Sequence, residues 1–378
     1  MAAKTKGAGS SVFFQLTRRH FIVFFKNKIQ VLYTLLVPII IFVVYIFFLR
    51  SMEMMTVENT LLSLETPIKL SDHPELEKYI GTVVDAWMLS GITALSTITV
   101  ALQTNNVIVD DKQKGVNRDF ASAPIPRNML IASYFLFNFI VTALICFIFE
   151  IVCFIYFAAM GEFVYNAVDL LLMVVVLLYM SINSTLMTVF LCSFFKTQAS
   201  LSSLIAVIST GMGFLIGAYM PLGMLPPWVQ NICAFIPGTF GCALFRFSFM
   251  DTPLQLLMGY VETSNIVADP SFITQITDTF GYQIHFFGMT VTPEWQAVAI
   301  AVYTLIFIAL NILSGRKLTT VLGVGKKRRK KKALAAALAQ KAAQSENAEH
   351  SENTETSLTE NSAQAAQADQ AAPTDEHK

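Results

Sequence analysis

Six long apolar stretches constrain this chain more than any other feature of its sequence. A helix needs roughly 20 mostly apolar residues to cross a bilayer, and six segments meet that length. The first contains Pro38, which spanning helices tolerate with a kink. We therefore expect an all-α, polytopic membrane protein with six transmembrane helices. The predicted spans lie near residues 30–49, 83–102, 129–158, 168–195, 201–219 and 295–314.

The overall composition agrees with a membrane protein. Hydrophobic residues make up 54% of the 378 residues and charged residues only 14%, whereas soluble domains carry about 25% charged residues. The formal net charge of zero gives no reason to expect a nucleic-acid partner. The first apolar run is too long for the apolar core of a signal peptide, so we expect it to remain as an anchor.

Lysine and arginine predict the orientation, because they accumulate on the cytoplasmic side of a membrane. They are frequent before the first span, between the second and third spans, and after the last span, and they are sparse in the other links. We therefore expect a multi-pass protein of the plasma membrane with both termini in the cytoplasm. Residues 1–29 would form a cytoplasmic amino-terminal region, residues 30–314 the transmembrane domain, and residues 315–378 a cytoplasmic tail.

Two segments that flank the first spans have a distinct pattern. Residues 11–28 have polar and cationic positions on one helical face and phenylalanines on most of the rest, which predicts an amphipathic helix in the cytoplasmic interface. A simple positive flank of the first span is the alternative. The link at 105–127 has charges of both signs, is interrupted by Gly115 and ends at Pro124 and Pro126, which is typical of a short surface helix. A solvated connector is the alternative there.

The run at 217–239 is too apolar for a free loop and too rich in proline for one continuous helix. Broken helices occur at membrane depth only where the protein buries their free backbone groups or where these groups line a cavity. We therefore expect a re-entrant hairpin before the last span, with Trp228 at the level of the lipid headgroups. The residues that define this outer hairpin are Pro221, Pro226, Pro227, Trp228 and Pro237.

Taken in order, these segments resemble the permease subunit of type-two ABC exporters over about residues 11–320. The resemblance rests on the amphipathic helix, on Asp111-x-x-x-Gly115 followed by Pro-Ile-Pro-Arg at 124–127, and on the proline-rich hairpin. It implies that the amphipathic helix is an elbow and that the first cytoplasmic link holds a coupling helix that docks on an ATPase. The implied coupling residues are Asp110, Asp111, Lys112, Lys114, Gly115, Arg118, Asp119 and Phe120.

The same resemblance implies partners and a transport role. The chain would pair with a second permease subunit, identical or different, and with separate ABC ATPase subunits that bind ATP and magnesium. It would export a drug, lipid, polysaccharide or peptide. The sequence itself contains no G-x-x-x-x-G-K-[S/T] phosphate loop, and the run Gly323–Lys327 lacks both the spacing and the hydroxyl residue. We therefore expect no cofactor on this chain and no ATPase activity of its own.

Enzyme chemistry has little support. The five histidines are scattered and the five cysteines show no metal-ligand spacing, so no metal site is expected. The sequence leaves open whether Cys233 and Cys242 pair.

An ion-coupled secondary transporter is the better alternative, because Glu150 lies inside the third span and an intramembrane carboxylate is costly. Glu150, Asn138 and Asn183 are the candidates for the translocation path. For the two asparagines, the alternative is that they only form interhelical hydrogen bonds. For Glu150, the alternative is that it lies near the outer interface of the membrane and bonds to a neighbouring helix.

Seven consecutive cations follow the last span, at Lys326–Lys332. Each cation near an anionic leaflet gains on the order of 1 kcal/mol, so we expect this run to contact anionic lipid. The alternatives are that it only enforces orientation, or that acidic residues of the tail fold back onto it. Beyond residue 340 the composition predicts disorder.

The charge asymmetry makes the topology testable by labelling single cysteines in a cysteine-free background. We expect cysteines placed at Ser71 and Ser271 to react with a membrane-impermeant maleimide in intact cells. Cysteines at Gln113 and Ser351 should react only after permeabilisation. Labelling of Gln113 from outside would contradict both the topology and the family resemblance.

Overall fold

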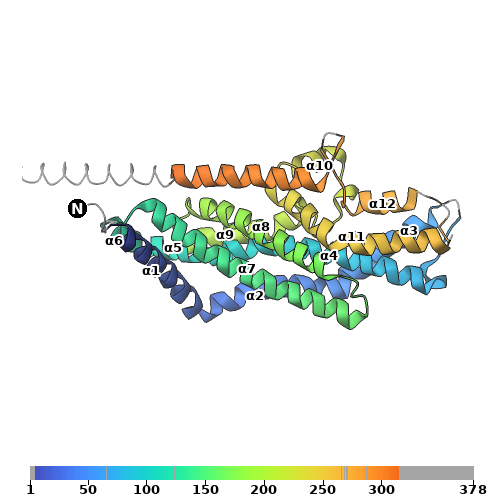
Figure 1. The fold of residues 1–378 in the computed structure, drawn as a ribbon, viewed down its shortest axis with the longest axis horizontal. Coiled ribbons are helices and arrows are strands. Elements are labelled where there is room, and N and C mark those ends of the chain that lie inside the picture. Colours follow the sequence, from blue (N-terminus) through green and yellow to red (C-terminus); the bar gives the residue numbers. More distant parts are fainter. Residues whose placement is uncertain are drawn as a thin grey trace, which may run out of the picture. The chain divides into compact units, whose positions relative to one another are not determined.

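The computed structural model describes residues 5–64, 66–122, 125–264, 266, 267, 269, 271–286 and 288–314. Within these residues the chain is almost wholly helical (Figure 1). Six helices there are long and apolar enough to cross a membrane, and each matches a predicted span, which confirms the all-α polytopic architecture. They are Lys28–Leu62, Pro74–Gln113, Arg127–Met160, Ala167–Cys192, Gln198–Leu215 and Pro293–Ser314.

The elements follow one another with short connections. The helices are α1 (Thr5–Lys26), α2 (Lys28–Val44), α3 (Arg50–Leu62), α4 (Pro74–Thr104), α5 (Asn106–Gln113), α6 (Val116–Ser122), α7 (Arg127–Met160), α8 (Ala167–Cys192), α9 (Gln198–Leu215), α10 (Pro227–Cys233), α11 (Pro237–Ser264) and α12 (Ser271–Thr279). Single turns are η1 (Tyr45–Leu49), η2 (Leu70–Asp72) and η3 (Leu222–Met224), and a small antiparallel hairpin pairs β1 (Ile284–Phe286) with β2 (Met289–Val291).

Helix α4 forms the core of the described bundle. It packs against α2, α7, α8, α9 and α11 (Figure 1), and from Ile80 to Thr104 every residue is buried. Small residues allow this close packing: a Cβ on Gly91 would lie 3.0 Å from the Cα of Ala218. The hydroxyls of Thr93 and Ser96 donate to carbonyls one turn earlier in the helix, so these two buried hydroxyls are satisfied without water.

The first span is longer than predicted. Residues 50–62, expected in an outer loop, continue the helix of α2 through the π-helical turn η1 as α3. The reason is a buried stripe at helical spacing, Glu53, Val57 and Leu61, which packs toward α4. Polar residues between these positions concealed the stripe in the sequence.

The predicted amphipathic helix is present as α1, and Asn27 separates it from α2 by capping the next helix. Its buried face is Leu16, His20 and Phe24, spaced four residues apart, and it packs on α7. Phe14, Ile22 and Phe25 remain exposed, as an interfacial helix requires.

The chain breaks where the prolines predict a break. Helices α10 and α11 meet at 97° across a short connection. Pro226 caps α10, Pro227 begins it, and Pro237 begins α11. Helix α11 then runs for 28 residues along α4, so much of the segment expected to be outer loop is a packed helix.

A buried carboxylate joins four segments at the end of α4 opposite α5. Asp85 accepts hydrogen bonds from the Tyr45 hydroxyl at 2.5 Å, from Arg50 Nε at 2.8 Å and from the Tyr156 hydroxyl at 3.1 Å. Arg50 also lies 3.5 Å from Glu162. The turn η1 and helices α3, α4 and α7 are therefore held together through one fully buried side chain.

Removing this acceptor should destabilise the bundle. Asp85→Ala leaves Arg50 without its main partner, and breaking a buried ion pair in this way costs about 3–5 kcal/mol. Chemical unfolding in detergent should show this loss. The exposed Asp72→Ala should change stability by less than about 0.5 kcal/mol. Equal stability of the two variants would show that the Asp85 network does not hold these helices.

Candidate functional site

The predicted coupling region consists of two short helices, α5 and α6, separated by Gly115. Gly115 has a φ of +79°, a conformation that glycine adopts without strain, and it ends α5 as its sequence position predicted. Helix α5 continues from α4 after a break at Asn105. Any force on α5 therefore reaches the most buried helix of the bundle.

An ion pair between a half-buried arginine and a buried carboxylate fixes α5 to the amphipathic helix α1. Arg19 donates to both carboxylate oxygens of Asp111, each at 2.6 Å. The hydroxyl of Tyr134 on α7 donates to the same carboxylate at 2.5 Å. Asp111 is 1% exposed, and bidentate arginine–carboxylate pairs are among the strongest hydrogen-bonded contacts. The carboxylate raises the pKa of Arg19, so this cation is permanent.

His20 supports this ion pair from the side. Its ring stacks on Tyr134 with centroids 4.0 Å apart and lies 3.1 Å from the Ser133 hydroxyl. Burial, with a smaller effect of the neighbouring Arg19 charge, lowers the pKa of His20 to about 4. His20 is therefore neutral at physiological pH.

Lys112 fixes α5 to the end of α8. Its ammonium donates to the backbone carbonyls of Cys192 and Ser193, each at 2.8 Å, and of Phe195 at 3.2 Å. The last carbonyls of a helix lack partners within the helix and carry a partial negative charge. A lysine from another helix satisfies them here.

Glutamines fix α5 to the start of α9. The Gln198 backbone N–H donates to Gln113 Oε1 at 2.8 Å, and the Gln198 side chain donates to the Asn106 carbonyl at 3.0 Å. Together with the two contacts above, α5 is bonded to α1, α7, α8 and α9.

The remaining coupling residues form the accessible side of this region. Lys114, which directly follows α5, pairs with Asp110 on α5 at 2.7 Å. Asp119 is exposed and Phe120 half-buried, and Phe120 lies beneath the Arg19 guanidinium at 5.3 Å. The side chain of Arg118 lies outside the described residues. The accessible surface of α5 and α6 therefore carries charges of both signs around one aromatic ring.

The three candidates for the translocation path share no recorded hydrogen bond with one another among the described residues. Asn138 donates to the Ala101 carbonyl on α4, and Asn183 donates to the Thr304 hydroxyl on the last helix. Both thus form interhelical bonds, the alternative that the sequence left open. Glu150 is fully buried, and neither carboxylate oxygen has a hydrogen-bond partner among the described residues. Its role in transport stays a prediction.

The outer hairpin is closed by a buried arginine that the sequence did not single out. Arg246 on α11 donates to the carbonyls of Gly217 and Gly281, at 2.5 and 3.2 Å. Its guanidinium also lies over the ring of Trp87, 5.7 Å from the centroid. Both glycines have positive φ, a backbone conformation that glycine adopts without strain.

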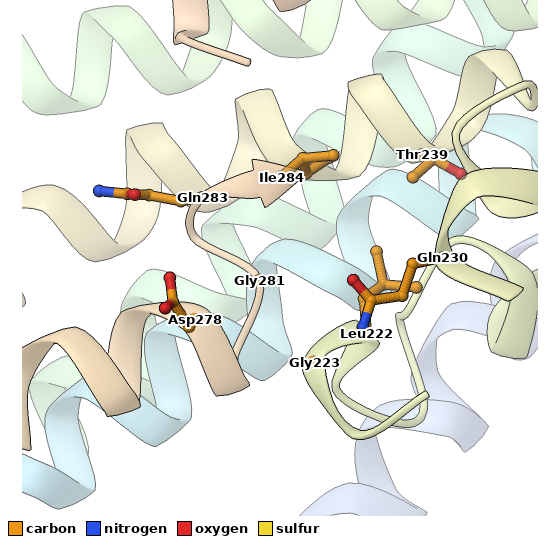
Figure 2. Close-up of a pocket in the computed structure, with 8 residues that line it drawn as sticks. All are labelled: Leu222, Gly223, Gln230, Thr239, Asp278, Gly281, Gln283 and Ile284. Atoms are coloured by element: carbon orange, nitrogen blue, oxygen red, sulfur yellow. The ribbon is translucent and has the colours of Figure 1, made fainter. Parts of the chain in front are cut away.

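Next to this arginine the η3 turn and α12 meet closely. Figure 2 shows Leu222 and Gly223 facing Gly281 and Asp278 across a cavity of about 20 Å³, which is enough for one water molecule. A Cβ on Gly223 would lie 2.4 Å from the Asp278 carbonyl oxygen.

Trp228 is exposed on α10. All five cysteines, Cys233 and Cys242 included, are free thiols.

Sequence reasoning missed the partners of these groups. Arg19, Tyr134, Asp85 and Arg246 were not candidates, since each acts across a large sequence separation. Asp85 could have been found, because it is a lone carboxylate inside a predicted span, the same signal that identified Glu150. Among the described residues no cluster of three metal-ligating side chains occurs.

Comparison with known proteins adds a decisive finding. A family model described as ABC-2 type transporter matches residues 11–250. The chain belongs to the ABC-2 type transporter family. The matched region runs from α1 through α5 and α6 into α11, so it includes every anchor of α5 described above.

One curated relative is similar to this ABC-2 permease. It is described as "Putative transport permease ycf38" of Porphyra purpurea and is 25% identical over 188 residues. The matched region covers 49% of this chain and 62% of the relative. The chain thus spans less than two thirds of the length of that relative.

The lysine that bonds the end of α8 can be tested by hydrogen exchange. Lys112→Met removes a charged hydrogen-bond donor worth about 1.5–3 kcal/mol. Amide exchange at residues 193–197 should therefore become at least about tenfold faster. Lys114→Met, which removes only a local ion pair, should leave that exchange unchanged. Identical exchange in both variants would contradict the proposed anchor.

The neutral state of His20 predicts a pH dependence of stability. Its folded pKa of about 4 lies below the unfolded value near 6.5. The unfolded state therefore binds the proton first, and stability falls as pH decreases from about 6.5 to about 4. His20→Gln should remove this component from pH-dependent unfolding in detergent. An unchanged slope would contradict the assignment of a neutral, buried His20.

Proposed function

We propose that this chain is the permease half of an ATP-driven exporter and that α5 and α6 receive a separate ABC ATPase subunit. The observation that supports the proposal is the anchoring of α5 to α1, α7, α8 and α9. When a segment bonded to four helices is displaced, the displacement is transmitted to those helices. The family match and the predicted cytoplasmic position of this link favour an ATPase as the partner that displaces it.

The proposed assembly contains two permease subunits and two ATPase subunits in the plasma membrane, with both termini of this chain in the cytoplasm. ATP and magnesium would bind on the ATPase alone. Exposed apolar side chains on α2, α9 and the last helix would face lipid or the second permease. The substrate would be a drug, lipid, polysaccharide or peptide, and anionic lipid would contact Lys326–Lys332, which lie outside the described residues.

The docking proposal can be tested by photocrosslinking in intact cells. A benzophenone amino acid at Gln113, Lys114 or Asp119, all exposed, should crosslink a subunit that contains a phosphate-loop sequence. The same amino acid at Trp228, exposed on α10, should not. Crosslinks to other proteins alone, or the same ATPase crosslinked from Trp228, would contradict the proposal.

The buried, unpartnered Glu150 favours one alternative, an ion-coupled carrier. If ATP drives transport, Glu150→Gln should change the substrate range or expression and leave ATP dependence intact. Transport that persists after ATP depletion, collapses with an ionophore and is lost in Glu150→Gln would instead support the ion-coupled carrier.

A further inference from the structure

One side of helix α1 is packed and the opposite side is open. The packed side, described above, is buried where α1 contacts α7. From residue 14 onward, the exposed residues of α1 recur at intervals that place them together on the opposite side of the helix. These residues are Phe14, Gln15, Arg18, Ile22, Phe25 and Lys26. The open side of α1 therefore combines cations with large apolar side chains.

Arg18 lies between two apolar side chains on this open side. Phe14 is one turn before it and Ile22 one turn after it, and these side chains are 64% and 51% exposed. An arginine can lie along apolar surface and present its charge to a polar headgroup. A helix with this pattern in the membrane interface contacts headgroups and acyl chains at the same time. The open side of α1 thus has the chemistry of a phospholipid contact.

The cations of the open side have no carboxylate partner in the described part of the chain. Arg18, Lys26 and Lys28, which begins α2, take part in none of the ion pairs found there. The adjacent Arg19 differs, because it is paired with Asp111. The open side and the start of α2 therefore carry three uncompensated positive charges.

The elements packed against α1 supply little negative charge. Helix α1 packs on α2, α5 and α7, and neither α1 nor α2 contains an acidic residue. Helix α7 begins with a further cation, Arg127, and its one acidic residue, Glu150, is fully buried. In α5, Asp110 and Asp111 are already paired with cations. Asp119 on α6 is exposed and is one negative charge against three positive ones.

We propose that the open side of α1 binds an anionic phospholipid. Arg18 contacts the phosphate, and Lys26 and Lys28 are attracted to the net negative charge of the headgroup. The exposed apolar side chains on either side of Arg18 contact the acyl chains. A zwitterionic lipid fits less well, because its own ammonium group cancels the charge of the phosphate.

This lipid site adjoins an anchor of α5. Arg19, which directly follows Arg18, holds Asp111 on α5. A lipid held at Arg18 therefore restrains the turn of α1 that positions α5. The inference goes beyond the proposed function, because a lipid can bind α1 whether or not an ATPase binds α5. Either proposal can fail while the other stands.

The test is photocrosslinking of the full chain in nanodiscs that contain phosphatidylcholine and phosphatidylglycerol in both leaflets. A benzophenone derivative of phenylalanine replaces Phe14, and mass spectrometry identifies the crosslinked lipid. The crosslink reports only lipid beside residue 14, so lipid bound to Lys326–Lys332 does not contribute. The same amino acid at Phe47, which is 73% exposed on η1, is the control position.

We expect the ratio of phosphatidylglycerol to phosphatidylcholine in crosslinks from Phe14 to exceed that of the nanodisc at least about threefold. Crosslinks from Phe47 should match the nanodisc. The double variant Arg18→Gln/Lys26→Gln should abolish the enrichment, and Lys196→Gln, which removes an exposed lysine outside α1, should retain it. Salt should weaken the enrichment, because the Debye length falls from about 10 Å at 0.1 M to 3 Å at 1 M.

Three results would overturn the proposal. The first is a lipid ratio at Phe14 equal to that of the nanodisc. The second is an enrichment that survives both the double variant and 1 M salt, which would show that these cations do not select the lipid. The third is crosslinking of Phe14 to a second copy of the chain in place of lipid, which would make the open side of α1 a contact between permeases.

Discussion

The contacts of the buried Asp111 carboxylate fix α5 to the rest of the bundle. A buried charge is tolerated only when it is paired and hydrogen-bonded, and Arg19 and Tyr134 supply three hydrogen bonds to it. Those partners come from α1 and α7, while Asp111 itself belongs to α5. The position of α5 is thus set by the need to satisfy this charge.

A second charged group holds the other end of α4. Asp85 gathers Tyr45, Arg50 and Tyr156, while the helix between Asp85 and Asp111 is buried and held by small residues and hydroxyls. Ionic contacts therefore hold α4 at Asp85 and hold α5, which follows α4, at Asp111. We expect a displacement of α5 to move α4 as well, as long as the chain does not bend at Asn105. Asn105 is itself buried and donates to the Thr188 hydroxyl on α8, which resists such bending.

Local patterns in the sequence predicted what is local in the structure. Run length and apolarity located the six spans, Gly115 located the end of α5, and the prolines located the bend before α11. The same patterns underestimated α3 and α11, because polar residues interrupt buried faces there. Charge pairing was not predictable. Arg19 and Asp111 are 92 residues apart, and no local rule identifies one as the partner of the other.

The contacts of Lys112 and Arg246 were not predictable from the sequence either. Lys112 was predicted as a coupling residue through family resemblance, yet its bonds to three carbonyls at the end of α8 depend on how two helices meet. Arg246 lies among phenylalanines in a segment expected to be outside, and its role in closing the hairpin appears only once Gly217 and Gly281 come together. Tertiary contacts of this kind need a structure.

The proposed function requires that α5 and its anchors move as one body when an ATPase partner binds ATP. Distances between spin labels, measured by double electron–electron resonance in the assembled transporter, test this requirement directly. Within one chain, labels at Lys114, directly after α5, and at Ser200 on α9 should keep their separation when ATP is added. Between the two permease copies of a homodimeric assembly, labels at Lys114 should change their separation. If the separation within one chain changes by as much as that between copies, α5 moves independently of the bundle and the account is contradicted.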